Sequence, residues 1–121
     1  MHEMGIASSV LDTVRKELQR FPNGHVYKVA LRIGELAGVD PDALSFCFEA
    51  LVRDSDLEPL ALEIERKRRQ HTCTVCALPF AAADENSCCP ACGSLDAIFS
   101  GGDELEIAYL EVEDGAAAAR A

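Results

Sequence analysis

The sequence predicts an α+β fold in which a small three-stranded sheet has two helices on one face. A zinc-ribbon-like module is predicted between the second and third strands. Apolar residues recur at helical spacing in two segments and alternate at strand spacing in three, and two Cys-x-x-Cys pairs precede the last strand. The 121 residues, 49% of them hydrophobic, suffice for one modest core. We therefore expect an α/β domain (1–70 and 101–114), an inserted zinc-binding domain (71–100) and a disordered tail (115–121).

The first helix is predicted over residues 4–21, after a lead-in formed by residues 1–3. Its apolar side chains recur at steps of three and four: Met4, Ala7, Leu11, Val14, Leu18 and Phe21. The second helix opens at Asp40-Pro41-Asp42, with Asp40 as N-cap and Pro41 at the first helical position. Cys47 lies in the apolar stripe of this helix, so we interpret it as a core residue and not as a metal ligand.

The three strands are predicted over residues 26–33, 60–66 and 105–112. In the first strand the residues expected to be buried are Tyr27, Val29, Leu31 and Ile33. The first strand, second helix and second strand are expected to form a right-handed crossover. The basic run 66–69 follows the second strand, and we interpret it as a solvated face.

The metal-binding motif consists of Cys73 and Cys76 in one pair and Cys89 and Cys92 in the other. Each pair brings two thiolates to one side of a tight turn, and two such turns supply the four ligands of a closed tetrahedral zinc site. Because no coordination position is left open, the zinc is expected to be structural. Cys88 leaves the register open by one residue. We prefer Cys89 because the run Cys-Pro-x-Cys-Gly then has its proline and Gly93 where the turn needs them, whereas Ala77 follows the first pair.

Composition and charge weigh against other uses of the cysteines. A thioredoxin-like redox site would use one pair at the start of a helix. From residue 71 onward there are nine acidic residues and one basic residue, Arg120, which disfavours nucleic-acid binding. A zinc deaminase would need a His-x-Glu element and an open zinc position, and neither is present.

The chain also offers no convincing nucleophile–base pair and no phosphate-cradling loop, so we expect that it is not an enzyme. A zinc-ribbon module for protein interaction or nucleic-acid binding is the alternative function. The sequence shows neither a membrane span nor a signal-peptide pattern, and we expect a cytoplasmic protein with no membrane partner.

The N-terminal tripeptide Met1-His2-Glu3 offers a second metal site. The His2 imidazole can share a metal with the α-amine of Met1 and the amide nitrogen of His2, closing a five- and a six-membered ring. This nitrogen-rich planar set suits Ni(II) or Cu(II) better than zinc. Glu3 offers a fourth donor, and Asp40 is a further candidate if its turn folds back over the N-terminus. His25 is interpreted as structural.

The chain as a whole resembles the HypA/HybF family of nickel metallochaperones, which serve the maturation of NiFe hydrogenase. The resemblance covers residues 1 to about 114, in collinear order, and rests on residues 1–3, 5–9, 31–39, 48–51, 100–102 and 104–113 together with both cysteine pairs. It implies that Met1, His2 and Glu3 bind Ni(II) and that Cys73, Cys76, Cys89 and Cys92 bind structural zinc.

The resemblance also implies that a HypB-type GTPase acts with the protein and that the hydrogenase large subunit receives the nickel. Whether urease accessory proteins are partners as well stays open. Some family members carry histidines directly after their cysteine pairs, where this chain has Ala77 and Gly93. We interpret His71 as a surface imidazole that does not replace them.

Overall fold

A computed structural model describes residues 2–114 of the chain. Met1, a predicted nickel ligand, and the tail at 115–121 lie outside the described residues. The elements in order are α1 (His2–Leu18), β1 (Gly24–Gly34), α2 (Pro41–Val52), β2 (Ala61–Lys67), β3 (Gln70–Cys73), β4 (Pro79–Ala81), β5 (Ala97–Gly101) and β6 (Leu105–Asp114). Neither helix within the described residues has the length and hydropathy needed to cross a bilayer.

The chain divides into two compact units. The first combines the chain up to Leu31, the stretch Val39–Glu65 and the chain from Ile107 onward. The second combines Arg32–Gly38 with Arg66–Glu106. The expected inserted domain at 71–100 lies within the second unit, and its boundaries stay a prediction.

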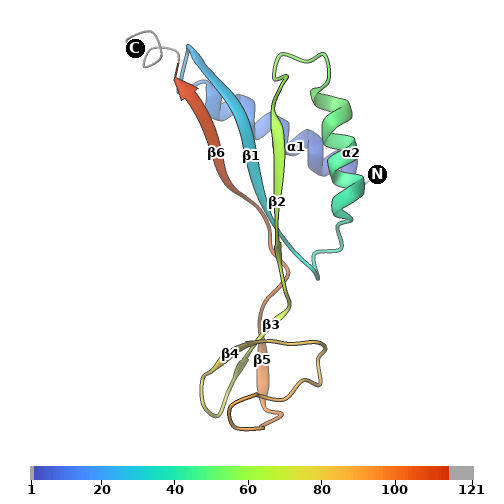
Figure 1. Ribbon diagram of the computed structural model, residues 1–121, viewed down its shortest axis with the longest axis vertical. Coiled ribbons are helices and arrows are strands. Elements are labelled where there is room, and N and C mark those ends of the chain that lie inside the picture. The colour runs from blue at the N-terminus through green and yellow to red at the C-terminus, as the bar shows by residue number, and fades with distance from the viewer. Residues whose placement is uncertain (1, 115–121) are drawn as a thin grey trace. The chain divides into compact units, whose positions relative to one another are not determined.

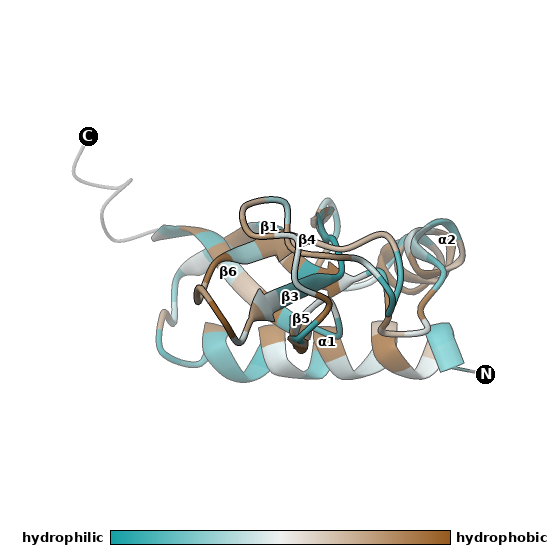
Figure 2. Ribbon diagram, turned by 90° about the horizontal axis from the view of Figure 1, so that it is seen from below, coloured by the Kyte–Doolittle hydropathy of each residue, from teal (hydrophilic) through white to brown (hydrophobic). Residues whose placement is uncertain are grey.

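The first unit carries both helices and most of a sheet with the strand order β2-β1-β6. Figure 1 shows that β1 and β2 run in the same direction, as the predicted crossover through α2 requires, and that β6 runs the opposite way. Figure 2 shows α1 along one side of this sheet, and α2 packs against α1. The predicted fold class, two helices with a small three-stranded sheet, is confirmed.

Helix α1 is shifted relative to its prediction. It begins at His2, so His2 and Glu3 form its first turn and are not a lead-in, and it ends at Leu18 instead of residue 21. Phe21, predicted as the last apolar residue of this helix, lies in the turn that follows it, where its N–H donates to the carbonyl of Leu18 at 2.9 Å. Met4 is 37% exposed, so the buried stripe begins one turn later, with Ala7, Val10, Leu11 and Val14.

Strand β1 departs from strict alternation. Tyr27 was expected in the core but is 45% exposed, whereas its neighbour Val26 is 1% exposed. From Val29 to Leu31 three consecutive residues are buried. The buried face of β1 therefore shifts by one residue along the strand, which a count of alternating apolar residues does not reveal.

Helix α2 starts as its sequence requires. The Asp40 carboxylate accepts hydrogen bonds from the backbone N–H groups of Asp42 at 3.0 Å and Ala43 at 3.3 Å, which confirms the predicted N-cap. Cys47 is buried on the inner face of α2, as predicted for a core residue.

The second unit contains a second sheet that the sequence did not predict, with antiparallel strands in the order β4-β3-β5. A small core lies beneath it, built from Cys73, Phe80, Ala82 and Cys89. The sheet positions both cysteine pairs, because β3 ends at Cys73 and β5 begins five residues after Cys92.

Two glycines allow the turn after β1 to pack within the second unit. A Cβ atom on Gly34 would lie 2.0 Å from the carbonyl oxygen of Gly102. Gly102 itself has a φ of +115°, which other residues rarely adopt. The contact therefore requires a residue without a side chain at both positions.

Candidate metal centre

The four cysteines of the two pairs converge on one point. The Sγ atoms of Cys73, Cys76, Cys89 and Cys92 all lie within 4.8 Å of one another. Two Sγ–Sγ distances, Cys73 to Cys92 and Cys76 to Cys89, are 3.6 Å. A tetrahedral site with Zn–S bonds of about 2.3 Å has S···S edges of about 3.8 Å. The donor set and its spacing therefore suit a structural zinc ion.

The two cysteine turns have the same backbone geometry. The N–H of Ala77 donates to the carbonyl of Cys73 at 3.0 Å, and the N–H of Gly93 donates to the carbonyl of Cys89 at 2.8 Å. Both closing residues have positive φ, +65° at Ala77 and +75° at Gly93. The positive φ predicted for Gly93 is confirmed, and Ala77 adopts the same conformation despite its Cβ.

Backbone amides distinguish the first cysteine of each turn from the second. The N–H groups of Cys76 and Val75 donate to Sγ of Cys73, at 3.5 and 3.4 Å, and lower the pKa of its thiol. The N–H groups of Cys92 and Ala91 lower the pKa of Cys89 to about 7 in the same way. Cys73 and Cys89 are therefore the sulfurs that ionise most easily.

The second cysteine of each turn behaves in the opposite way. The N–H of Leu78 lowers the pKa of Cys76, but contacts with the neighbouring sulfurs, Cys89 first, outweigh it and raise this pKa to about 12. At Cys92 the N–H of Ser94 lowers the pKa, and the contact with Cys73 leads the effects that raise it overall. A metal ion must therefore displace the protons of Cys76 and Cys92 when it binds.

The remaining two cysteines lie apart from this cluster. Cys88 is exposed and does not join the four converging sulfurs, so the structure selects the register with Cys89. Cys47 lies in α2, in the first unit.

His71 is buried, and its interpretation as a surface imidazole is wrong. It is only 4% exposed. Its ring makes edge contacts with Phe80 and Phe99, with centroids 6.0 and 6.4 Å away. Arg69 donates from Nε to Nε2 of His71 at 3.1 Å. The alternation of His71 with Cys73 along β3 was the available signal, since both side chains then point to the buried side of a strand.

Two of the candidate nickel residues, His2 and Glu3, lie within the described residues and contact each other. The Nδ1 atom of His2 lies 3.3 Å from Oε2 of Glu3, and the backbone N–H of Asp40 donates to the same oxygen at 3.3 Å. The His2 side chain is 56% exposed, whereas that of Glu3 is 14% exposed. The contacts with His2 and then Asp40 lower the pKa of the Glu3 carboxyl. His25 is exposed at the start of β1.

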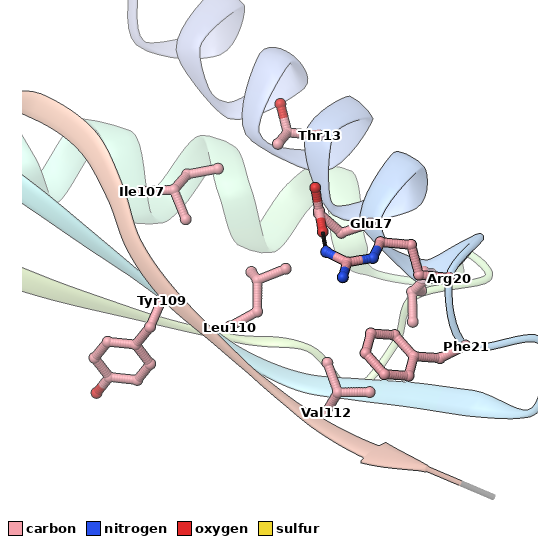
Figure 3. A pocket seen from close by; sticks show the side chains of 9 residues that line it. Thr13, Glu17, Arg20, Phe21, Ile107, Tyr109, Leu110 and Val112 are labelled. Carbon is pink, nitrogen blue, oxygen red and sulfur yellow. Dashed lines mark hydrogen bonds and ion pairs between the residues drawn. The ribbon is translucent and has the colours of Figure 1, made fainter.

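A groove between α1 and β6 carries none of the predicted site residues. Its volume is about 560 Å³, and its apolar lining includes Leu18 of α1, Phe21 of the turn that follows, and Leu110 and Val112 of β6. Figure 3 shows Phe21, Leu110 and Val112 and the Glu17–Arg20 ion pair, whose N···O distance is 3.3 Å. Its polar lining residues are Thr13, Glu17, Arg20 and Tyr109.

The chain is similar to known proteins over nearly its whole length. Residues 1–112 match the family model described as hydrogenase/urease nickel incorporation, metallochaperone, hypA. The hydrogenase maturation factors HypA of Geobacter metallireducens and Geotalea uraniireducens are each 42% identical over 113 residues, which covers 93% of this chain and 100% of theirs.

Two solved structures share the fold. The solution structure of the Ni metallochaperone HypA from Helicobacter pylori aligns with a TM-score of 0.60 and 22% identity, over 90% of this chain and 95% of that one. A second solution structure of a HypA protein aligns with a TM-score of 0.69 and 23% identity, over 94% and 98% of the two chains.

Proposed function

Because this chain belongs to the HypA family of metallochaperones for hydrogenase and urease nickel incorporation, we propose that its N-terminus binds Ni(II). It delivers the metal, together with a HypB-type GTPase, to the large subunit of NiFe hydrogenase. The family is one of metallochaperones and not of enzymes, so GTP hydrolysis belongs to the partner. Urease accessory proteins are a second class of recipient, and the cytoplasm is the proposed compartment.

The observation that carries this proposal is the exposed His2 imidazole beside the Glu3 carboxylate at the start of α1. The 3.3 Å contact between Nδ1 and Oε2 joins two donor groups, one nitrogen and one oxygen. The lowered pKa keeps Glu3 ionised at neutral pH, so its carboxylate is available to a cation. With the amine of Met1 and the amide of His2, these groups form the nitrogen-rich set that Ni(II) favours.

The helix start also supports coordination by a backbone amide. The first four N–H groups of an α-helix have no intrahelical acceptor, so a metal can replace the proton of the His2 amide without breaking a helical hydrogen bond. The positive end of the helix dipole opposes a cation at this place. The carboxylate of Glu3, in the first turn of α1, offsets this effect.

Asp40 contributes to this site through its backbone, whose N–H holds Glu3. Its carboxylate already caps α2, and we propose it only as a further oxygen donor. The four cysteines bind zinc as a structural ion, which closes the two turns and contributes folding free energy to a unit with a small core.

Calorimetry with Ni(II) on untagged protein tests the proposal. His2→Ala should abolish high-affinity binding, while His25→Ala, which removes another exposed imidazole, should leave it unchanged. Zinc content and circular dichroism should be the same in all three proteins, since neither side chain belongs to the core. Equal nickel affinity of wild type and His2→Ala would refute the N-terminal site.

A further inference from the structure

Two apolar side chains of the second unit, next to the cysteine turns, are exposed to solvent. Val75 is 67% exposed and Leu95 is 74% exposed. Neither belongs to the core of Cys73, Phe80, Ala82 and Cys89. Apolar side chains exposed singly are ordinary, so their weight as a candidate partner surface depends on whether the backbone places them side by side.

The backbone brings these two residues together. Thr74 donates to the carbonyl of Asp96 twice, from its N–H at 2.8 Å and from Oγ1 at 2.7 Å. Val75 follows Thr74 and Leu95 precedes Asp96, so the pair lies at one end of the β3–β5 ladder. Both residues lie in segments fixed by the cysteine turns, so little conformational entropy is lost when a partner covers them.

Charge selects the kind of partner. Residues 70–106 contain six acidic residues and no lysine or arginine, and the basic residues of this unit are confined to Arg32 and the run 66–69, outside the cysteine turns. Cys76 and Cys92 are the exposed pair of the four sulfurs, and a divalent zinc ion with four thiolates keeps a net negative charge. Two copies of such a surface would repel each other, and nucleic acid would be repelled as well. A partner with apolar side chains flanked by lysine or arginine would be attracted.

We propose that Val75, Leu95 and the exposed Asp96 form a docking surface for a protein partner that presents apolar side chains within a basic rim. The proposal rests on the proposed function, because the two proteins tested for binding are the GTPase and the hydrogenase large subunit. The apolar pair supplies affinity, and the acidic surroundings supply orientation and a dependence on salt.

The test measures binding of the zinc-loaded full chain to each purified protein by biolayer interferometry. The double variant Val75→Ser/Leu95→Ser should bind at least one of them about tenfold more weakly or worse, as expected for truncated interface anchors. Asp96→Lys reverses one charge and should also weaken this binding, and added salt should weaken binding of the wild type. Zinc content is measured for each variant, and Asp96→Lys decides the matter if the double variant loses zinc.

Ile98→Ser is the matched control. Ile98 is 60% exposed in the same unit, but it follows Ala97, which packs on the core, so along β5 it points to the opposite side. Its substitution should leave binding within about twofold of wild type.

Four results would overturn the proposal. These are unchanged binding in the Val75/Leu95 and Asp96 variants, an equal loss in Ile98→Ser, a wild-type chain that binds neither protein, and a wild-type dimer that the double variant abolishes. Nickel calorimetry on the same proteins reports separately on the N-terminal site, so a failure of the proposed function is distinguishable from a failure of this surface.

Discussion

Ala77→Gly should strengthen zinc binding. Ala77 has a φ of +65°, in the left-handed region that costs a non-glycine residue roughly 1–2 kcal/mol. Glycine removes this strain but increases the freedom of the unfolded chain, which costs about 0.4–1 kcal/mol. The net gain should be about 0.5–1 kcal/mol. We expect zinc binding to stabilise the closed turn, so the gain should lower the zinc dissociation constant by up to about fivefold.

Gly93→Ala provides the reciprocal change. Gly93 has a φ of +75°, and a Cβ built there meets no atom within 4 Å, so alanine adds backbone strain without a steric clash. Its zinc affinity should fall by up to about fivefold. Competition with a chelator of known zinc affinity, at fixed pH, measures both variants against wild type.

Ala91→Gly is the control, because Ala91 lies in the second turn but is not among the residues with positive φ. Glycine there only loosens the unfolded chain and should weaken zinc binding. Weaker binding in Ala77→Gly, to the same extent as in Ala91→Gly, would refute the argument that the turn after Cys76 is strained.

Three further predictions concern the register, the protons and the helix cap. Cys89→Ser should lose zinc, whereas Cys88→Ser should retain it by elemental analysis; the reverse result would contradict the register. Zinc binding at neutral pH should release at least the protons of Cys76 and Cys92, because their raised pKa values keep both thiols protonated without metal. Zinc affinity should therefore fall as pH falls. Calorimetry in buffers of different ionisation enthalpy counts the released protons, and a pH-independent zinc affinity would contradict the assignment. Asp40→Ala should lower the free energy of unfolding by about 1 kcal/mol, because it removes the N-cap of α2. Asp40→Asn should not lower it, because asparagine caps a helix equally well. Equal losses of unfolding free energy in the two variants, measured by urea denaturation, would show that the cap is unimportant.

The sequence by itself determined the features that depend on near neighbours. Helical spacing identified both helices, and the Asp-Pro-Asp sequence identified the N-cap of α2. The Cys-x-x-Cys spacing identified the sulfur cluster, because two thiols three residues apart meet on one side of a turn whatever the rest of the chain does.

The sequence did not predict the three short strands of the second unit. The strands β3, β4 and β5 contain between three and five residues each, too few for alternation to stand out. They form because β3 pairs with both neighbours, and the register that joins His71 to Phe99 spans 28 residues. The burial of His71 follows from this pairing, and so its polarity alone led to the wrong interpretation.

Only the tertiary structure decided which distant groups meet. Glu3 receives the N–H of Asp40 although 37 positions separate them, and Gly34 touches Gly102 because neither carries a side chain. Such contacts depend on strand register and on the path of the turns, which no local spacing records. Local geometry specified which four sulfurs converge, whereas long-range packing brought the backbone of Asp40 to the carboxylate of Glu3.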